Sequence, residues 1–202
     1  MTAAWNKWYH CISSTYGSWL HGDGRGFRTR HHREHVIGDY KDPPPPQRYA
    51  DRARASQLRM RADTVSLTHQ DRLLVCLKVA ETLVAYGTEI VDMCVGEHHM
   101  HLLARFAEVL PPRIDGSAVR LPRNLLADGR EPIPRHVLGR ANRAASIAMG
   151  KAGRKAEGTP LWAKRPKVLP IANRAHQIEV VRYIREHARE GAVIWSKLVK
   201  GA

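Results

Sequence analysis

The stretch His98–Arg105, with the sequence HHMHLLAR, carries most of the information about the fold and about a functional site. His99 and His101 flank one apolar residue and lead directly into an apolar run. Because side chains alternate between the two faces of a β-strand, this spacing places both imidazoles on one face and Met100 on the other. Two convergent imidazoles are suitable ligands for a divalent metal ion.

The residues around this stretch predict a β-hairpin. Residues 89–95 have the composition of a strand, Gly96 and Glu97 supply a turn, and residues 100–106 form the returning strand. The histidine pair then lies at the start of a central strand. The chain contains 12 histidines, so an H-x-H pattern can arise by chance, and the hairpin context is what favours a metal site.

A second group of candidate residues lies on a predicted helix over residues 171–190. Tyr183 and His187 are four residues apart and therefore share a face of that helix. Taken singly, the tyrosine could be a half-buried core residue, and the histidine could be a cation favoured by the helix dipole. Gly191 ends the run as a C-cap residue would. The helical spacing rests on Ile178, Val181, Ile184 and Ala188.

Two segments resemble motifs of the HUH single-tyrosine transposases, in particular the REP-associated tyrosine transposases of insertion-sequence type. Residues 97–103 resemble the HUH motif, which is a histidine, a hydrophobic residue and a histidine. Residues 182–187 are similar to the Y-I-x-x-[QN] signature, with His187 where glutamine or asparagine is usual. The glycine-rich run after residue 14 also looks like the opening of some bacterial relatives. The resemblance covers roughly residues 5–20 and 67–195.

The resemblance implies a fold, a site and a reaction. The fold would be α+β, an antiparallel sheet with helices on one face, of the ferredoxin-like or RRM-like HUH nuclease type. His99, His101 and His187 would bind a divalent metal ion, Mg²⁺ or Mn²⁺, and Tyr183 would be the catalytic nucleophile. The reaction would cleave and rejoin hairpin-containing single-stranded DNA, as in the family, through a 5′-phosphotyrosine intermediate. Family members act as monomers or homodimers.

The order of the remaining elements fits the same class. It is strand, helix, strand, strand, helix, strand, helix, which is typical of an antiparallel α+β sandwich. We expect a first strand over residues 8–16, helices over 67–86 and 134–150, and an edge strand over 162–168. The helix over 67–86 has one candidate buried face, formed by Leu73, Leu74, Leu77, Ala80 and Val84.

The chain length predicts one domain, residues 1–202, with a surface insertion at about 28–62. Four consecutive prolines at 43–46 exclude a helix interior or a central strand at that point. A short helix is expected at about 50–61. The three cysteines, Cys11, Cys76 and Cys94, are scattered and indicate buried thiols in a reducing compartment. With no apolar leader and no apolar run of about 20 residues, the predicted location is cytoplasmic.

The charge balance predicts a polyanionic partner. Lys and Arg number 33 against 19 Asp and Glu, which gives a formal net charge of +14 and a pI of about 10.3. Nucleic acid fits best, because no cationic amphipathic helix with a broad apolar face is evident that would favour a membrane surface. The first choices for phosphate contacts, each of which could equally be a solvated surface charge, are Arg140, Arg143, Lys164 and Arg165.

Two other functions remain open at this point. One is a non-catalytic, domesticated protein that binds single-stranded nucleic acid on the same fold, for which Tyr183 would be dispensable. The other is a metal-dependent nuclease that activates water, for which the histidines matter but no covalent adduct forms. The correctly phased tyrosine favours the strand-transfer enzyme over both.

Overall fold

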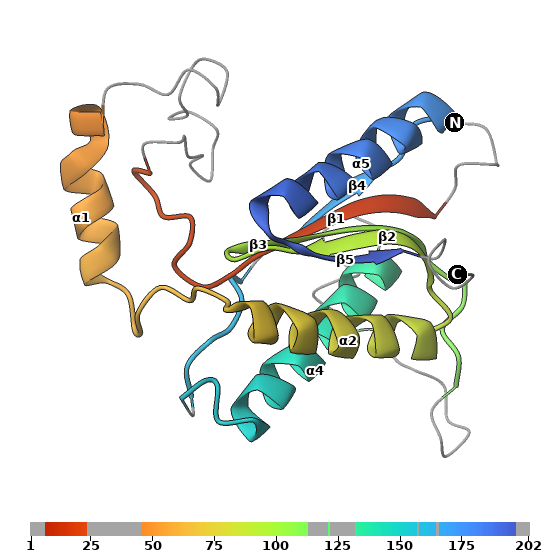
Figure 1. Ribbon diagram of the computed structural model, residues 1–202, viewed down its shortest axis with the longest axis horizontal. Coiled ribbons are helices and arrows are strands. Elements are labelled where there is room, and N and C mark those ends of the chain that lie inside the picture. The colour runs from red at the N-terminus through yellow and green to blue at the C-terminus, as the bar shows by residue number, and fades with distance from the viewer. Residues whose placement is uncertain are drawn as a thin grey trace.

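The structure is a computed structural model that describes residues 7–23, 46–112, 121, 132–156, 158–164 and 166–196. Its centre is a five-stranded antiparallel sheet with the strand order β4-β1-β3-β2-β5. The predicted α+β class is therefore confirmed, and the topology is consistent with a ferredoxin-like fold (Figure 1). The strands are β1 (Trp8–Ser14), β2 (Glu89–Val95), β3 (His99–Arg105), β4 (Lys167–Pro170) and β5 (Val193–Ser196). The helices are α1 (Ala50–Leu58), α2 (His69–Ala85), α4 (Pro132–Lys151) and α5 (Arg174–Glu186), with 3-10 turns η2 (Pro46–Tyr49) and η3 (His187–Glu190).

The predicted hairpin of β2 and β3 is confirmed. Its turn is closed by a 2.8 Å hydrogen bond from the backbone N–H of Gly96 to the carbonyl of His99. β3 is the central strand and pairs with β1 on one side and β2 on the other. In this register His99 lies opposite Ser14 and His101 lies opposite Ile12. The histidine pair thus lies at the beginning of the central strand of the sheet.

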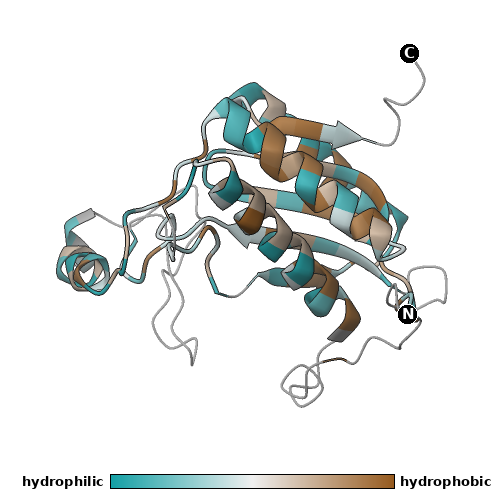
Figure 2. Cartoon of the chain, turned by 90° about the horizontal axis from the view of Figure 1, so that it is seen from below, coloured by the Kyte–Doolittle hydropathy of each residue, from teal (hydrophilic) through white to brown (hydrophobic). Residues whose placement is uncertain are grey.

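Helices cover both faces of the sheet rather than one. α2 and α4 lie on one face of the sheet, as Figures 1 and 2 show. They enclose the main core, which includes Met100 and Leu102. α5 covers the opposite face, where Val180 and Ile184 contact Leu103. The reason is that β3 is apolar on both faces beyond its histidines, so each face needs a covering helix.

The predicted buried face of α2 is only partly right. Ala80 is buried, but Leu73, Leu77 and Val84 are about half exposed or more. The buried side chains form the neighbouring stripe Val75, Cys76, Val79, Ala80 and Leu83. Both stripes have helical spacing, so periodicity alone could not choose between them, and packing against the sheet and α4 does.

The start of α2 is fixed by a capping box. The side chain of Thr68 accepts a hydrogen bond from the backbone N–H of Asp71, and the Asp71 carboxylate accepts one of 2.9 Å from the backbone N–H of Thr68. Arg154, which follows α4, donates to the same carboxylate at 2.8 Å. The capping box therefore also links the two helices of this layer.

Several boundaries differ from expectation. The edge strand β4 begins at Lys167, not at residue 162, because Trp162 forms only an isolated bridge to Thr15 while its ring packs on the main core. β5 was not predicted. Of the proposed insertion, residues 28–45 lie outside the described residues, and the remainder forms η2 and α1, which confirms the short helix.

The three cysteines are buried free thiols, as predicted. Burial raises the pKa of Cys76 to about 11 and that of Cys94 to about 12, so neither thiol is reactive at neutral pH. Among the described helices, none combines the length and apolar character that a membrane span requires.

Candidate metal centre

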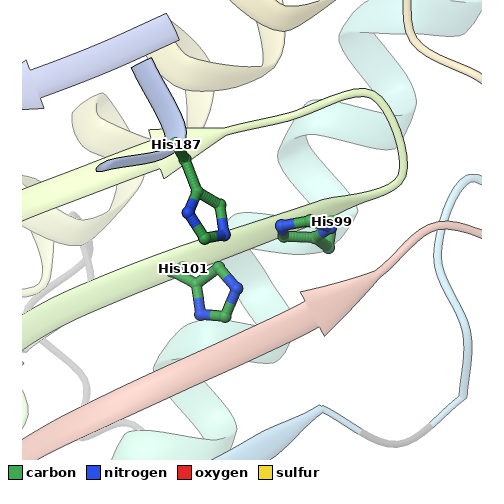
Figure 3. Close-up of side chains that lie close together, drawn as sticks. All are labelled: His99, His101 and His187. Atoms are coloured by element: carbon green, nitrogen blue, oxygen red, sulfur yellow. The ribbon is translucent and has the colours of Figure 1, made fainter. Parts of the chain in front are cut away.

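Three histidine side chains from two distant segments meet on the α5 face of the sheet (Figure 3). His99 and His101 project from β3, and His187 comes from the first residue after α5. One nitrogen of each ring lies within 4.8 Å of the other two. The ring centroids are 4.9 to 5.0 Å apart, with His101 and His187 buried and His99 half-buried. The predicted trio is therefore brought together, close enough to hold one metal ion.

The position of His187 depends on how α5 is seated. Asn173 caps the N-terminus of α5, because its side-chain oxygen accepts a 2.9 Å hydrogen bond from the backbone N–H of His176. Val180 and Ile184 bury its apolar stripe against the sheet. Arg185 binds the fully buried carboxylate of Asp92 on β2, with the closest contact at 3.1 Å. These contacts hold the last turn of α5 above the histidines of β3.

His101 is held in its neutral form. Burial, reinforced by the neighbouring histidines and Lys167, lowers the pKa of His101 to about 2. A ring must be unprotonated to bind a metal, so at neutral pH no proton has to be removed from His101 first. His101 is therefore in the neutral form that donates a lone pair to a metal.

A fourth histidine, His10, belongs to the site and was not predicted. It lies on β1, is 8 % exposed, and its Nε2 is 3.0 Å from Nδ1 of His101. Burial, together with repulsion from His176, His187 and Lys167, lowers the pKa of His10 to about 4. The alternation of β1 could have placed His10 on this face, but nothing in the sequence identifies its partner.

Tyr183 lies beside the histidines, as its spacing from His187 predicted. Its ring centroid is 4.8 Å from that of His187, 5.0 Å from that of His101 and 6.2 Å from that of His10. The side chain is 41 % exposed, so one side of the ring faces the histidine cluster while the residue remains accessible from solvent. A nucleophile for a large substrate needs this combination.

The donor set suits a transition-metal ion. Imidazole nitrogen binds zinc, for example, at about 2.0–2.1 Å, and three histidine ligands leave a further coordination position for substrate or water. Mg²⁺, by contrast, prefers oxygen ligands. Three converging imidazoles therefore fit a divalent metal ion.

The residues chosen as phosphate contacts are not gathered at this site. Arg140 and Arg143 are exposed on α4, which covers the opposite face of the sheet. Lys164 is exposed in the segment before β4, and Arg165 lies outside the described residues. Lys167 on β4, which was not chosen, is close enough to influence the pKa values of both His10 and His101.

No protein-family model matches this chain, and a search of curated proteins finds no similar sequence.

Proposed function

We propose that this protein is a transposase-like endonuclease of the HUH single-tyrosine type, which cleaves and rejoins single-stranded DNA. The observation that carries the proposal is the convergence of Tyr183 with His99, His101 and His187. These residues come from two segments more than 80 positions apart in the chain. A structural role alone does not require three metal-ligand side chains and a partly exposed tyrosine at one point.

In this proposal each residue has a defined task. His99, His101 and His187 would hold a divalent ion, Mn²⁺ in preference to Mg²⁺, because Mg²⁺ prefers oxygen ligands. The ion would polarise the scissile phosphate and offset its negative charge. His10 orients His101 through their hydrogen bond, in the way that partners of metal-bound histidines commonly do.

Tyr183 is the proposed nucleophile. Its hydroxyl loses its proton to solvent, its oxygen bonds to the phosphorus, and the bond from phosphorus to the 3′ oxygen breaks, with the leaving oxygen taking up a proton. One DNA fragment then ends in a free 3′-hydroxyl, and the other is linked to Tyr183 through its 5′ phosphate. Because the phosphotyrosine bond keeps the energy of the broken one, a 3′-hydroxyl can attack it later, and rejoining needs no ATP.

Single-stranded DNA is the proposed substrate. The net charge of +14 favours a polyanion, and Lys167 places a cation near the site. Unpaired bases can be splayed apart, which lets a backbone phosphate approach residues on a sheet face, whereas a stacked duplex cannot be opened without cost.

The proposal is tested by incubating the protein with Mn²⁺ and labelled single-stranded DNA that carries hairpins, and by resolving the products on a denaturing gel. The wild type should give a labelled protein adduct and a cut strand. Tyr183→Phe and His101→Ala should give neither. Tyr86→Phe is the matched control, because it also removes one hydroxyl from a half-buried tyrosine and should leave the adduct unchanged.

Other results of this experiment would identify one of the two alternative functions. Cutting that survives in Tyr183→Phe without an adduct would identify a nuclease that activates water. Binding without cutting or adduct, over varied hairpins and metals, would identify a non-catalytic nucleic-acid-binding protein. Either result would overturn the strand-transfer proposal.

A further inference from the structure

An arm formed by residues 46–61 extends from the sheet without joining its core. It contains η2 and α1, and no residue of α1 is buried. Figures 1 and 2 both show α1 standing apart from the helices that cover the sheet. A nine-residue helix is marginal on its own, and α1 has no fully buried side chain that would stabilise it through packing. We refer to residues 46–61 as the basic arm.

The basic arm is strongly cationic. Within residues 46–61 the chain has five arginines and one acidic residue, Asp51. Arg54, Arg59 and Arg61 are exposed, and none of the three forms an ion pair with another residue in the described ranges. Their positive charges are therefore available to a polyanion.

The inner side of the arm is fixed to the loop that follows β1. The Ser56 hydroxyl donates to the carbonyl of His21 at 2.6 Å, and the backbone N–H of Arg61 donates to the Tyr16 hydroxyl at 2.8 Å. Gly22 lies so close to the backbone of Ala53 that a Cβ would collide with it, and its φ of 96° is in the region that favours glycine. These contacts join the middle of α1, and the segment just after it, to the loop.

That loop is in turn attached to the metal centre. The backbone N–H of Thr15 donates to the carbonyl of His98 at 2.8 Å, and the Ser18 hydroxyl donates to the same carbonyl at 3.2 Å. His98 immediately precedes His99. The basic arm is therefore held at a fixed position relative to the histidine cluster. DNA bound to the arm would be held at a fixed position relative to His99, His101 and His187.

The outer side of α1 has the side chains that suit a duplex. Arg54 and Gln57 are exposed and three residues apart, so they share a face. Arginine and glutamine are the residues that pair with guanine and adenine edges in the major groove, which is wide enough for one helix. α1 carries no aromatic residue, so it has no platform on which single-stranded bases would stack.

We infer that the basic arm binds double-stranded DNA, the paired stem beside the single strand that reaches Tyr183. The inference rests on the proposed function for the identity of that single strand. The binding of duplex by the arm, however, does not depend on the tyrosine and is measured without it.

The test measures binding of a labelled blunt duplex of about 12 base pairs, slightly more than one helical turn, to the full chain by fluorescence anisotropy without metal. The arm variant is Arg54→Ala/Arg59→Ala. The control variant, Lys78→Ala/Lys151→Ala, removes the same charge from α2 and α4. The arm variant should weaken duplex binding about tenfold relative to the control. It should also reduce the slope of log K against log salt concentration by at least about 0.9, which is the contribution of the one phosphate contact that the loss of Arg59 removes.

The results distinguish a failure of duplex binding by the basic arm from a failure of the proposed strand-transfer function. Equal effects of the arm and control variants would overturn the inference, because binding would then depend on net charge alone. A loss confined to single-stranded DNA would also overturn it. Adduct formation on a short unpaired strand is measured in parallel and should be unchanged in the arm variant. If the wild type forms no adduct while the arm variant still loses duplex selectively, the proposed function fails and the duplex-binding arm stands.

Discussion

His10 and His101 are joined across neighbouring strands, with Nε2 of His10 3.0 Å from Nδ1 of His101. This contact engages Nδ1 of His101 and leaves its Nε2 as the atom available to a metal. A neutral ring that binds metal through Nε2 carries its proton on Nδ1, so that N–H would donate to His10. Because burial and nearby positive charge lower the pKa of His10 to about 4, His10 is neutral and able to accept.

Removing His10 should weaken metal binding without unfolding the protein. His10→Ala takes away the acceptor that orients His101, and partners of this kind typically contribute about 10–100-fold in metal affinity. Isothermal titration with Mn²⁺ or Zn²⁺ measures the change. His69→Ala removes an exposed histidine at the start of α2 and serves as the matched control. Equal affinities of the two variants would show that His10 has no positioning role.

Metal should stabilise the fold through the three histidines. An ion that binds only the folded state raises the free energy of unfolding by about 2.7 kcal/mol at a hundredfold excess over its Kd. Thermal unfolding should therefore shift upward with Mn²⁺ or Zn²⁺ and return with EDTA. The shift should vanish in His99→Ala, His101→Ala and His187→Ala. An undiminished shift in all three would place the ion elsewhere.

Arg185 should matter more than its exposed neighbour Arg182. Arg185→Ala leaves the carboxylate of Asp92, which is 0 % exposed, without its guanidinium partner. An unsatisfied buried acceptor costs about 1–3 kcal/mol. Denaturant unfolding should show this loss for Arg185→Ala and little change for Arg182→Ala. Equal stabilities would contradict the claim that this ion pair seats α5 on the sheet.

The α2 capping box should make stability depend on acid pH. Burial alone would raise the pKa of Asp71, but hydrogen bonds from Thr68 and Arg154 outweigh it and hold the pKa below its usual value. The carboxylate therefore stabilises the fold above the unfolded pKa of about 3.9, and this contribution is lost as the pH falls through the folded pKa. Asp71→Asn should cost about 1 kcal/mol at pH 7.

The role of the ionised Asp71 carboxylate is checked by measuring stability at lower pH. Unfolding of wild type and Asp71→Asn is followed from pH 7 to pH 2, and the difference between them should shrink below about pH 4. Asp63→Asn, an exposed acid outside any helix, is the control. A difference that stays constant over this range would contradict a role for the ionised carboxylate.

The closeness of His99 to His101, and of Tyr183 to His187, could be predicted because each pair follows a local periodicity, whereas the meeting of the two pairs was implied only by the family resemblance. A period of two joins His99 to His101, and a spacing of four joins Tyr183 to His187. His10 could not be predicted as a partner, because it meets His101 only through the register of β1 with β3, and the two residues are 91 positions apart.

The sequence predicted which segments form helices and strands better than it predicted which side of each element is buried. The hairpin of β2 and β3 follows from a run of apolar residues interrupted by Gly96, whereas β5 is four residues long and too short to give a periodic signal. The buried stripe of α2 and the placement of α5 on the second face depend on which apolar surfaces meet. The packing of the whole domain decides which surfaces meet. α5 packs on the Leu103 side of the sheet, and no local sequence pattern predicts that contact.

The most direct test of the central claim is to locate the DNA on the protein. The protein is incubated with Mn²⁺ and single-stranded DNA, the product is digested with nuclease and protease, and the peptides are analysed by mass spectrometry. The account predicts a nucleotide linked through its 5′ phosphate to the peptide that contains Tyr183. A nucleotide on another residue, or cut DNA with no modified peptide, would contradict it.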